Sequence, residues 1–154
     1  MRSGEDRSGK RLLGLDYGDK TVGVAVSDGL GLTAQGVEII RRKRVDKLRQ
    51  TYARLEVLSV EYGACGIVLG LPLLPDGREG ERSDGTRAFG EGLIRRIGLP
   101  VVYWNESFST HEAYELMRQT RVPVDKRDDY VDEIAAMIIL QDYLDNHGTD
   151  CIFG

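Results

Sequence analysis

The sequence predicts an α/β fold in which helices flank a five-stranded mixed sheet, with three antiparallel strands followed by two parallel ones. In the first 40 positions, short apolar runs rich in Val and Leu alternate with turn-forming residues, which indicates consecutive strands. Helical spacing begins only after residue 45, and strands then alternate with helices. A strand that follows a helix needs a crossover connection and lies parallel, whereas consecutive strands can pair antiparallel.

The predicted strands are short apolar segments bounded by turn-forming residues: residues 11–17, 21–27, 32–40, 65–69 and 100–105. The turn-prone sequence Gly18-Asp19-Lys20 makes the first two of them a hairpin. Gly36 predicts a bulge or bend in the third strand. The fourth segment is apolar throughout, as expected of a strand buried on both faces of the sheet.

Four segments have the spacing of a helix: residues 45–62, 86–98, 109–120 and 130–147. Gly63 predicts the end of the first helix, and Ser109 with Glu112 matches a capping box at the start of the third. The side chains of the last helix that we expect toward the core are Val131, Ile134, Ala135, Ile138 and Tyr143. The connection over residues 70–85 is longer than usual, which is typical of functional or mobile loops.

A chain of 154 residues, of which 41% are hydrophobic, fits one domain with a real core. We expect that domain over residues 11–148, with a disordered tail at residues 1–10 and a C-terminal tail at residues 149–154. No segment has the length of apolar sequence that a membrane helix needs, and the start lacks the apolar region of a secretory signal. Cys65 and Cys151 have no zinc-ligand spacing and resemble reduced thiols. The sequence thus predicts a cytoplasmic protein with no membrane contact.

The formal net charge of −4 conceals a gradient along the chain. Residues 1–54 hold 12 basic and 7 acidic side chains, whereas residues 125–154 hold 2 and 8. Residues 41–54 alone contain seven cations and one anion. A solvated helix face is one interpretation of this segment. The other is a contact for nucleic acid, since a phosphate backbone responds to charge within about 8–10 Å.

Three carboxylates stand at strand or helix ends beside apolar runs, where a rigid scaffold could present them to one site. Asp16 lies in the first strand, where an unpaired charge is unfavourable. Glu106 closes the last strand and could instead be a solvated charge. Asp132 is expected in the first turn of the last helix, where it could merely stabilise the helix dipole.

Gathered together, the three carboxylates Asp16, Glu106 and Asp132 predict a metal site. Two carboxylates about 4 Å apart repel by about 4 kcal/mol at an effective dielectric near 20, so a cluster needs a divalent cation. Hard oxygen ligands suit Mg²⁺ or Mn²⁺, and two such ions can drive phosphodiester hydrolysis. His111 and His147 have no partner at ligand spacing.

Four blocks of sequence, spread over residues 12 to 144, carry a family resemblance. They are Asp16-Tyr17-Gly18 with Lys20 and Gly23-Val24-Ala25-Val26, Gly70-Leu71-Pro72-Leu73 with Asp76-Gly77, the segment 106–113 (ESFSTHEA), and Val131-Asp132-Glu133-Ile134-Ala135-Ala136 with Ile138-Ile139-Leu140. In this order and spacing they resemble the YqgF (RuvX) family.

The resemblance implies an RNase H-like fold, related to the RuvC junction resolvases, with a three-carboxylate site at Asp16, Glu106 and Asp132 that holds Mg²⁺ or Mn²⁺. The activities attributed to the family are Holliday junction resolution and maturation of the 5′ end of pre-16S ribosomal RNA. We therefore expect a metal-dependent nuclease whose partner is branched DNA or precursor rRNA, in DNA recombination and repair or in ribosome biogenesis. Two symmetric cuts in a junction would need a homodimer, and a monomer remains the alternative.

The chain departs from the family where Asp-Glu-Arg is usual, because it has Asn105-Glu106-Ser107. The missing arginine could pair with a carboxylate or a phosphate, so a catalytically weak or inactive nucleic-acid-binding adaptor is an alternative function. An ATP-binding protein of the actin and sugar-kinase type would share the Asp16-to-Gly23 pattern, but it needs two such halves and this chain is too short.

The cations that could replace the missing arginine are Lys20, Arg78, Arg82 and Lys126. Those that could contact the substrate backbone are Lys20, Arg41, Arg42, Lys43, Arg44, Arg78 and Arg82. Four aromatic residues near the predicted site could stack on bases, although core packing is the simpler interpretation of each: Tyr17, Tyr103, Trp104 and Phe108.

Overall fold

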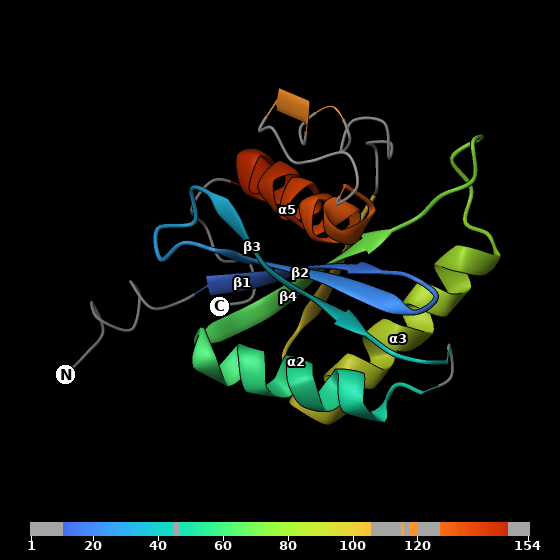
Figure 1. The fold of residues 1–154 in the computed structure, drawn as a ribbon, viewed down its shortest axis with the longest axis horizontal. Helices are drawn as coiled ribbons and strands as arrows, with labels where there is room; N and C mark the ends of the chain where they lie inside the picture. Colours follow the sequence, from blue (N-terminus) through green and yellow to red (C-terminus); the bar gives the residue numbers. More distant parts are fainter. Residues whose placement is uncertain (1–10, 45–46, 106–114, 116–117, 120–126, 148–154) are drawn as a thin grey trace.

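The computed structural model describes residues 11–44, 47–105, 115, 118–119 and 127–147. The helices and strands follow one another as β1 (Arg11–Tyr17), β2 (Thr21–Ser27), β3 (Ala34–Arg41), α2 (Arg49–Glu61), β4 (Ala64–Leu71), α3 (Glu81–Ile97), β5 (Val101–Asn105) and α5 (Arg127–His147). The strands form one sheet in the order β3-β2-β1-β4-β5. Figure 1 shows α5 on one face of the sheet and α2 with α3 on the other.

The sheet has the predicted topology. β1 pairs antiparallel with β2, and β2 with β3, whereas β1, β4 and β5 are parallel to one another. The first hairpin closes through the amide of Gly18, which donates to the carbonyl oxygen of Thr21 at 2.8 Å. Ala25 pairs with Gly36 while Val24 pairs with Glu38, so one extra residue of β3 is accommodated there. The predicted bulge beside Gly36 is confirmed.

The start of α3 differs from the prediction, because the helix begins at Glu81 and not at residue 86. The hydroxyl oxygen of Ser83 accepts a hydrogen bond from the amide of Gly80 at 3.2 Å, and Glu81 with Asp84 puts negative charge in the first turn. Both features stabilise a helix N-terminus. The polar, glycine-containing sequence resembles a loop, but it is the first turn of a helix, so the β4–α3 loop shortens to residues 72–80.

Other boundaries move less. The first predicted helix begins at Arg49, four residues late, and the Gly63 that follows it has φ +64°, which confirms the predicted glycine end. The last helix begins at Arg127, three residues before the predicted start. The predicted helix over residues 109–120 lies mostly outside the described residues, as do both predicted tails.

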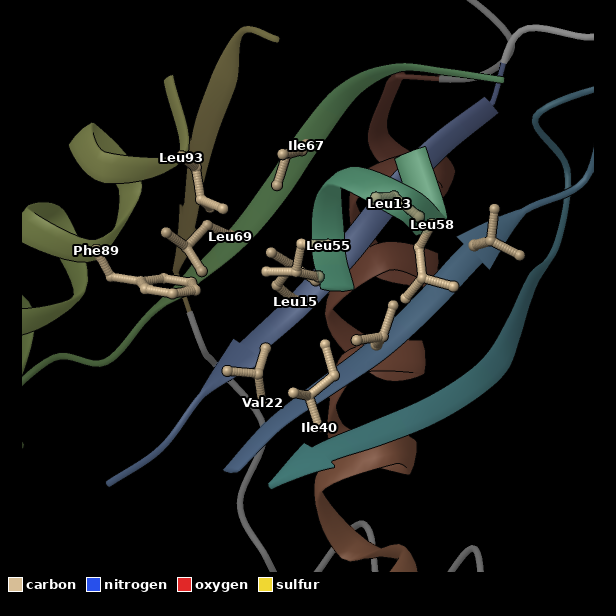
Figure 2. Close-up of a cluster of buried hydrophobic side chains, with 12 residues drawn as sticks. Leu13, Leu15, Val22, Ile40, Leu55, Leu58, Ile67, Leu69, Phe89 and Leu93 are labelled. Atoms are coloured by element: carbon tan, nitrogen blue, oxygen red, sulfur yellow. The ribbon is translucent and has the colours of Figure 1, made fainter. Parts of the chain in front are cut away.

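The core between the sheet and the α2–α3 layer consists of alternate strand residues (Figure 2). Leu13 and Leu15 of β1 are fully buried there, against Leu55 of α2 and Phe89 and Leu93 of α3. Because strand side chains alternate between faces, Leu12, Gly14 and Asp16 of β1 face α5.

Glycines on the α5 face of the sheet allow α5 to lie close to the strand backbone. A Cβ atom on Gly14 of β1 would lie 2.6 Å from the Cβ of Leu140, so the helix packs almost directly on the strand backbone. The buried side chains of α5 are Ala135, Ala136, Ile139, Leu140, Tyr143 and Leu144. The predicted core positions Val131, Ile134 and Ile138 are only half-buried, so that part of the prediction is wrong.

In the described part of the chain, no helix combines the length and hydropathy that crossing a bilayer requires.

Candidate carboxylate site at the sheet edge

The carboxyl ends of the parallel strands meet at one edge of the sheet. Leu71 at the end of β4 pairs with Asn105 at the end of β5, and β1 runs alongside β4 and ends at Tyr17. The beginning of β2 and the end of β3 reach the same edge, because Thr21 pairs with Arg41. In open α/β sheets, ligands bind outside the carboxyl ends of the strands. This edge is therefore where a functional site is expected.

Asp16 lies at this edge on the face covered by α5. It pairs across the β1–β2 ladder with Gly23, and paired residues project to the same face. Its side chain is half-buried. The predicted position of Asp16, in a central strand beside apolar neighbours, is confirmed.

Asp132 reaches the same place from α5. A Cβ on Gly23 would lie 1.9 Å from the carbonyl oxygen of Asp132, so only a glycine in β2 allows the helix to approach this closely. The hydroxyl of Thr21, two residues earlier on the same face, donates to Oδ2 of Asp132 at 2.5 Å. The fold thus brings Asp16 and Asp132 to one end of the β1–β2 hairpin.

The helical position of Asp132 differs from the prediction. Because α5 begins at Arg127, Asp132 lies in the second turn and not the first. The helix dipole acts mainly within the first turn, so it is a weak reason for a carboxylate here. Asp132 also shares its side of the helix with Ala136 and Leu140, which face the sheet. The position favours a site residue over a simple helix stabiliser.

Glu106, the third predicted carboxylate, lies outside the described residues, as do His111 and Phe108. Asn105, which precedes Glu106 in the chain, is exposed at the end of β5. Across residues 11–44, 47–105 and 127–147, no three Asp, Glu, His or Cys side chains come together as a metal site. The two described carboxylates, with the Thr21 hydroxyl beside them, are hard oxygen donors of the kind that Mg²⁺ and Mn²⁺ prefer, so the donor set fits.

The Thr21 hydrogen bond leads to a prediction about Asp132. Replacing Thr21 by Val keeps the shape of the side chain but removes the donor that orients the carboxylate. Partners of this kind change metal affinity by about 10–100-fold, so we expect Thr21→Val to weaken Mn²⁺ binding by that factor. Isothermal titration with Mn²⁺ measures it, and Thr21→Ser should restore the affinity. Equal affinity in Thr21→Val and the wild type would show that this bond does not orient the site.

Most of the predicted cations gather at this edge. Lys20, Arg41, Lys43 and Arg44 are exposed around the β1–β2 turn and the end of β3. The backbone amide of Arg42 donates to the carbonyl oxygen of Lys20 at 2.8 Å, which holds the two segments side by side. The positive charge of this part of the chain therefore lies beside Thr21, at the same end of the hairpin as Asp16 and Asp132.

Arg42 has an internal role that the sequence did not reveal. Its side chain is only 9% exposed, and Nη2 donates to the carbonyl oxygens of Gly18 and Asp19 at 2.6 Å each. The guanidinium lies 4.9 Å from the centre of the Tyr17 ring, whose ring also stacks on Phe89 at 4.2 Å. Arg42 thus holds the β1–β2 turn in place through these hydrogen bonds, and Tyr17 packs against Arg42 and Phe89. The sequence had suggested a phosphate contact for Arg42 and base stacking for Tyr17.

Trp104 and Tyr103, two of the other predicted aromatic residues, also make internal contacts. The indole of Trp104 donates to Oδ2 of Asp142 at 2.6 Å and meets Tyr143 edge-on at 5.3 Å. The hydroxyl of Tyr103 donates to the carbonyl oxygen of Arg87 at 3.2 Å. Packing between β5 and its helices accounts for both residues.

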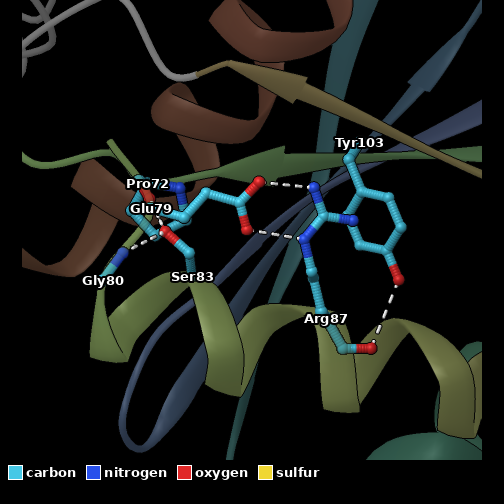
Figure 3. A network of polar contacts seen from close by, with 6 residues as sticks. All are labelled: Pro72, Glu79, Gly80, Ser83, Arg87 and Tyr103. Carbon is cyan, nitrogen blue, oxygen red and sulfur yellow. Dashed lines mark hydrogen bonds and ion pairs between the residues drawn. The ribbon is translucent and has the colours of Figure 1, made fainter. Parts of the chain in front are cut away.

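The β4–α3 loop is tightly held at its base (Figure 3). The Arg87 guanidinium donates two hydrogen bonds of 2.7 Å to the carboxylate of Glu79 and lies 4.7 Å from the Tyr103 ring centre. The hydroxyl of Ser83 donates to the carbonyl oxygen of Pro72. These contacts join the loop to α3 and β5, so its length does not imply a loosely attached segment.

The two predicted cations of this region differ. Arg78 in the loop pairs with Asp76 at 2.5 Å, but both side chains are more than half exposed, so the pair contributes little stability. Arg82 is exposed in the first turn of α3, with no ion pair to any other residue that the structure describes.

Glu133, next to Asp132, leads to a prediction about pH. Burial, with a smaller contribution from the negative charge of Glu38, raises the pKa of Glu133 above its usual 4.5. Because the pKa is higher in the folded state, the stability gained by protonation is fully present below pH 4.5 and is lost as the pH rises through the folded pKa. We expect Glu133→Gln to melt at a higher temperature than the wild type at pH 7, with the difference vanishing near pH 4. A lower melting temperature at pH 7 would contradict this.

Sequence reasoning missed two residues of this site, Thr21 and Gly23, as neighbours of Asp132. The sequence feature that could have indicated them is the pattern Thr-x-Gly in β2, the strand paired with Asp16. It places a polar residue and a residue without a side chain on the same face of an apolar strand. Only the packing of α5 reveals what the two positions contact.

Comparison with known proteins agrees with these features. A relative from Agathobacter rectalis, named "Putative pre-16S rRNA nuclease", is 55% identical over 135 residues, which span 88% of this chain and 94% of the relative. A relative of the same name from Lachnospira eligens is 45% identical over 136 residues, which span 88% of this chain and 97% of the relative.

Solved structures show the same architecture. Thermus thermophilus RuvC in complex with a Holliday junction substrate superposes with a TM-score of 0.58, at 12% identity, over 92% of this chain and 98% of RuvC. A second structure of Thermus thermophilus RuvC gives a TM-score of 0.55 at 13% identity. The fold is therefore RuvC-like, which confirms the RNase H-like expectation.

A family model described as "RuvX: Holliday junction resolvase" matches residues 10–146, nearly the whole chain. That match covers the strands that carry Asp16 and Gly23 and the helix that carries Asp132. Together with relatives that are named as nucleases, it establishes that the chain belongs to the RuvX (YqgF) family.

Proposed function

We propose that this RuvX-family chain is a divalent-metal-dependent nuclease that hydrolyses phosphodiester bonds in structured nucleic acid. The observation that carries the proposal is the convergence of Asp16 and Asp132, far apart in the sequence, on Thr21 and Gly23 at the carboxyl edge of the sheet. Two half-buried carboxylates at such an edge favour the binding of a cation beside them. Family membership supports the reaction class.

Asp16, Asp132 and Glu106 are the residues that would hold Mg²⁺ or Mn²⁺. When bound, two such ions would activate a water molecule and stabilise the leaving oxygen of the phosphodiester. Asp16 is held by a central strand and Asp132 by the Thr21 hydroxyl, so neither carboxylate has to be ordered when substrate arrives. The exposed cations Lys20, Arg41, Lys43 and Arg44, beside the site, attract the phosphate backbone.

The substrate chemistry that fits is a phosphodiester strand within a folded or branched nucleic acid. The names of the relatives favour precursor rRNA, and the description of the family favours branched DNA. Either substrate agrees with action in the cytoplasm, in rRNA maturation or in DNA recombination and repair. Junction cutting further predicts a homodimer, whereas trimming of an rRNA end needs only a monomer.

The test is cleavage of two labelled probes, a 5′ fragment of pre-16S rRNA and a four-way DNA junction, with Mg²⁺, Mn²⁺ or EDTA. We expect one of the probes to be cut in Mg²⁺ or Mn²⁺ and neither in EDTA. Cutting that continues in EDTA would refute the metal mechanism. Metal binding without cutting of either probe would favour the nucleic-acid-binding adaptor. The observation in favour of this alternative is Asn105, which is exposed at the position where the family usually has an acid.

A further inference from the structure

α3 contains three glycines in its helical stretch after the first turn, and only two of them are explained by packing. A Cβ on Gly90 would lie 2.3 Å from the Tyr103 hydroxyl oxygen, and a Cβ on Gly92 would lie 2.2 Å from that of Tyr52. A Cβ on Gly85 would meet nothing within 4 Å. Glycine is the weakest helix former after proline, so an exposed helical glycine without a steric reason suggests another function.

Gly85 lines a cleft of about 220 Å³ between the β1–β2 turn and the first two turns of α3, which we call the Gly85 cleft. The other lining residues are Tyr17, Gly18, Asp19, Glu81, Arg82 and Thr86. The cleft is smaller than the roughly 300–1,000 Å³ that whole small-molecule ligands occupy, so it suits one unit of a larger ligand. Tyr17 directly follows Asp16 at the end of β1, so the cleft opens at the same edge of the sheet as the candidate carboxylate site, on the α3 side of the sheet.

The charges of the cleft indicate what that unit is. Arg82 forms no ion pair with any other described residue, whereas its neighbours Arg78 and Arg87 are paired with Asp76 and Glu79. An available guanidinium is suited to bind two oxygens of a phosphate.

Two carboxylates, Asp19 and Glu81, also line the cleft. They repel a doubly charged free phosphate but can accept hydrogen bonds from hydroxyl or amino groups. The combination fits a singly charged phosphodiester with its sugar and base, that is, one nucleotide within a strand.

We propose that the Gly85 cleft binds one nucleotide unit of the substrate strand beside the bond that is cut, with its phosphate against Arg82, and that Gly85 keeps the cleft open. The inference deepens the proposed nuclease function and rests on it. A side chain at position 85 would occupy the cleft. Glycine leaves this space to the substrate and makes the helix less stable than alanine would.

The experiment compares Gly85→Ala and Arg82→Ala with the wild type in fluorescence anisotropy titrations, in EDTA so that the probes stay intact. The probes are a fluorescein-labelled four-way DNA junction and a labelled pre-16S rRNA 5′ fragment. We expect Gly85→Ala to raise the melting temperature by about 2 °C and yet to weaken binding several-fold. Arg82→Ala should weaken binding about tenfold or more.

Two controls on the same helix match these changes. Glu91→Ala also raises helix propensity at an exposed position but lies outside the cleft, and Arg95→Ala removes the same charge near the other end of α3. Both should bind within twofold of the wild type. A binding loss confined to one probe identifies the strand, DNA or RNA, that occupies the cleft.

Wild-type affinity of Gly85→Ala for both probes would overturn the inference. So would an equal loss in Arg95→Ala and Arg82→Ala, because the effect would then come from net charge alone. In either case the nuclease proposal would stand as long as the wild type cuts one probe with metal. If the wild type neither binds nor cuts either probe, the proposed function itself fails.

Discussion

Asp16→Asn is expected to reduce cleavage by at least about a hundredfold, since losing a direct ligand should exceed the effect of losing a supporting contact. The substitution keeps the size of the side chain and removes one negative charge beside Asp132. Mn²⁺ should raise the melting temperature of the wild type, because it binds only the folded site, and should leave Asp16→Asn almost unchanged.

Cleavage rates and melting curves across a Mn²⁺ titration measure both effects. Glu61→Gln, an exposed acid-to-amide change at the end of α2, is the control and should match the wild type in both. Wild-type cleavage by Asp16→Asn would exclude Asp16 from the mechanism. A large loss of stability without metal would mean that Asp16 supports the strand and not the chemistry.

Gly23→Ala is expected to lower the free energy of unfolding by about 3 kcal/mol, at the upper end of the range for overpacked positions. The added Cβ would lie 1.9 Å from the carbonyl oxygen and 2.4 Å from the carbonyl carbon of Asp132. These are backbone atoms of a long helix, so relief requires α5 to move away from the sheet. The movement would also pull Asp132 from Thr21, and cleavage should fall together with stability.

Gly36→Ala is the matched control, because it adds the same methyl group to the same face of the neighbouring strand. The atoms that it would meet first belong to the Glu133 side chain, at 2.3 to 2.9 Å, and that side chain can rotate away. We expect a loss below about 1 kcal/mol, within the range for substitutions that neighbours accommodate. Urea unfolding curves compare the two variants. Equal losses would show that the close approach of the α5 backbone is not what requires Gly23.

The strands were predictable because each depends on its own local sequence. The short runs rich in Val and Leu, the Gly18–Lys20 turn and the bulge beside Gly36 all appear in the structure as expected. The start of α3 was not predictable in this way, because the polar sequence before Thr86 favours a loop in isolation. In the folded protein, this sequence is helical because Ser83 caps the helix at Gly80 and contacts Pro72. Local propensity is weak evidence for residues such as Ser and Asp, which are common both in turns and at helix N-termini, when a tertiary contact decides between the two.

The basic segment shows the same division. Its sequence indicates positive charge at one place, but not that Arg42 is buried under the hairpin turn while Arg41, Lys43 and Arg44 stay exposed. Arg42 has two carbonyl partners at hydrogen-bond distance, and only the folded chain shows this.

The sequence by itself determined the α/β class and the strand order along the chain, and it predicted Asp16, Glu106 and Asp132 as the site carboxylates, since these depend on residue type and spacing. The tertiary structure alone decided that Asp16 and Asp132 lie at one end of the β1–β2 hairpin, that Thr21 orients Asp132 and that α5 turns Ala136 and Leu140 toward the sheet. The physical reason is that glycines on the sheet allow helix and strand backbones to come into contact. That contact depends on the absence of a Cβ atom at glycines in the strands, which are far from the helix in the sequence. The spacing of apolar residues in the helix therefore cannot predict it.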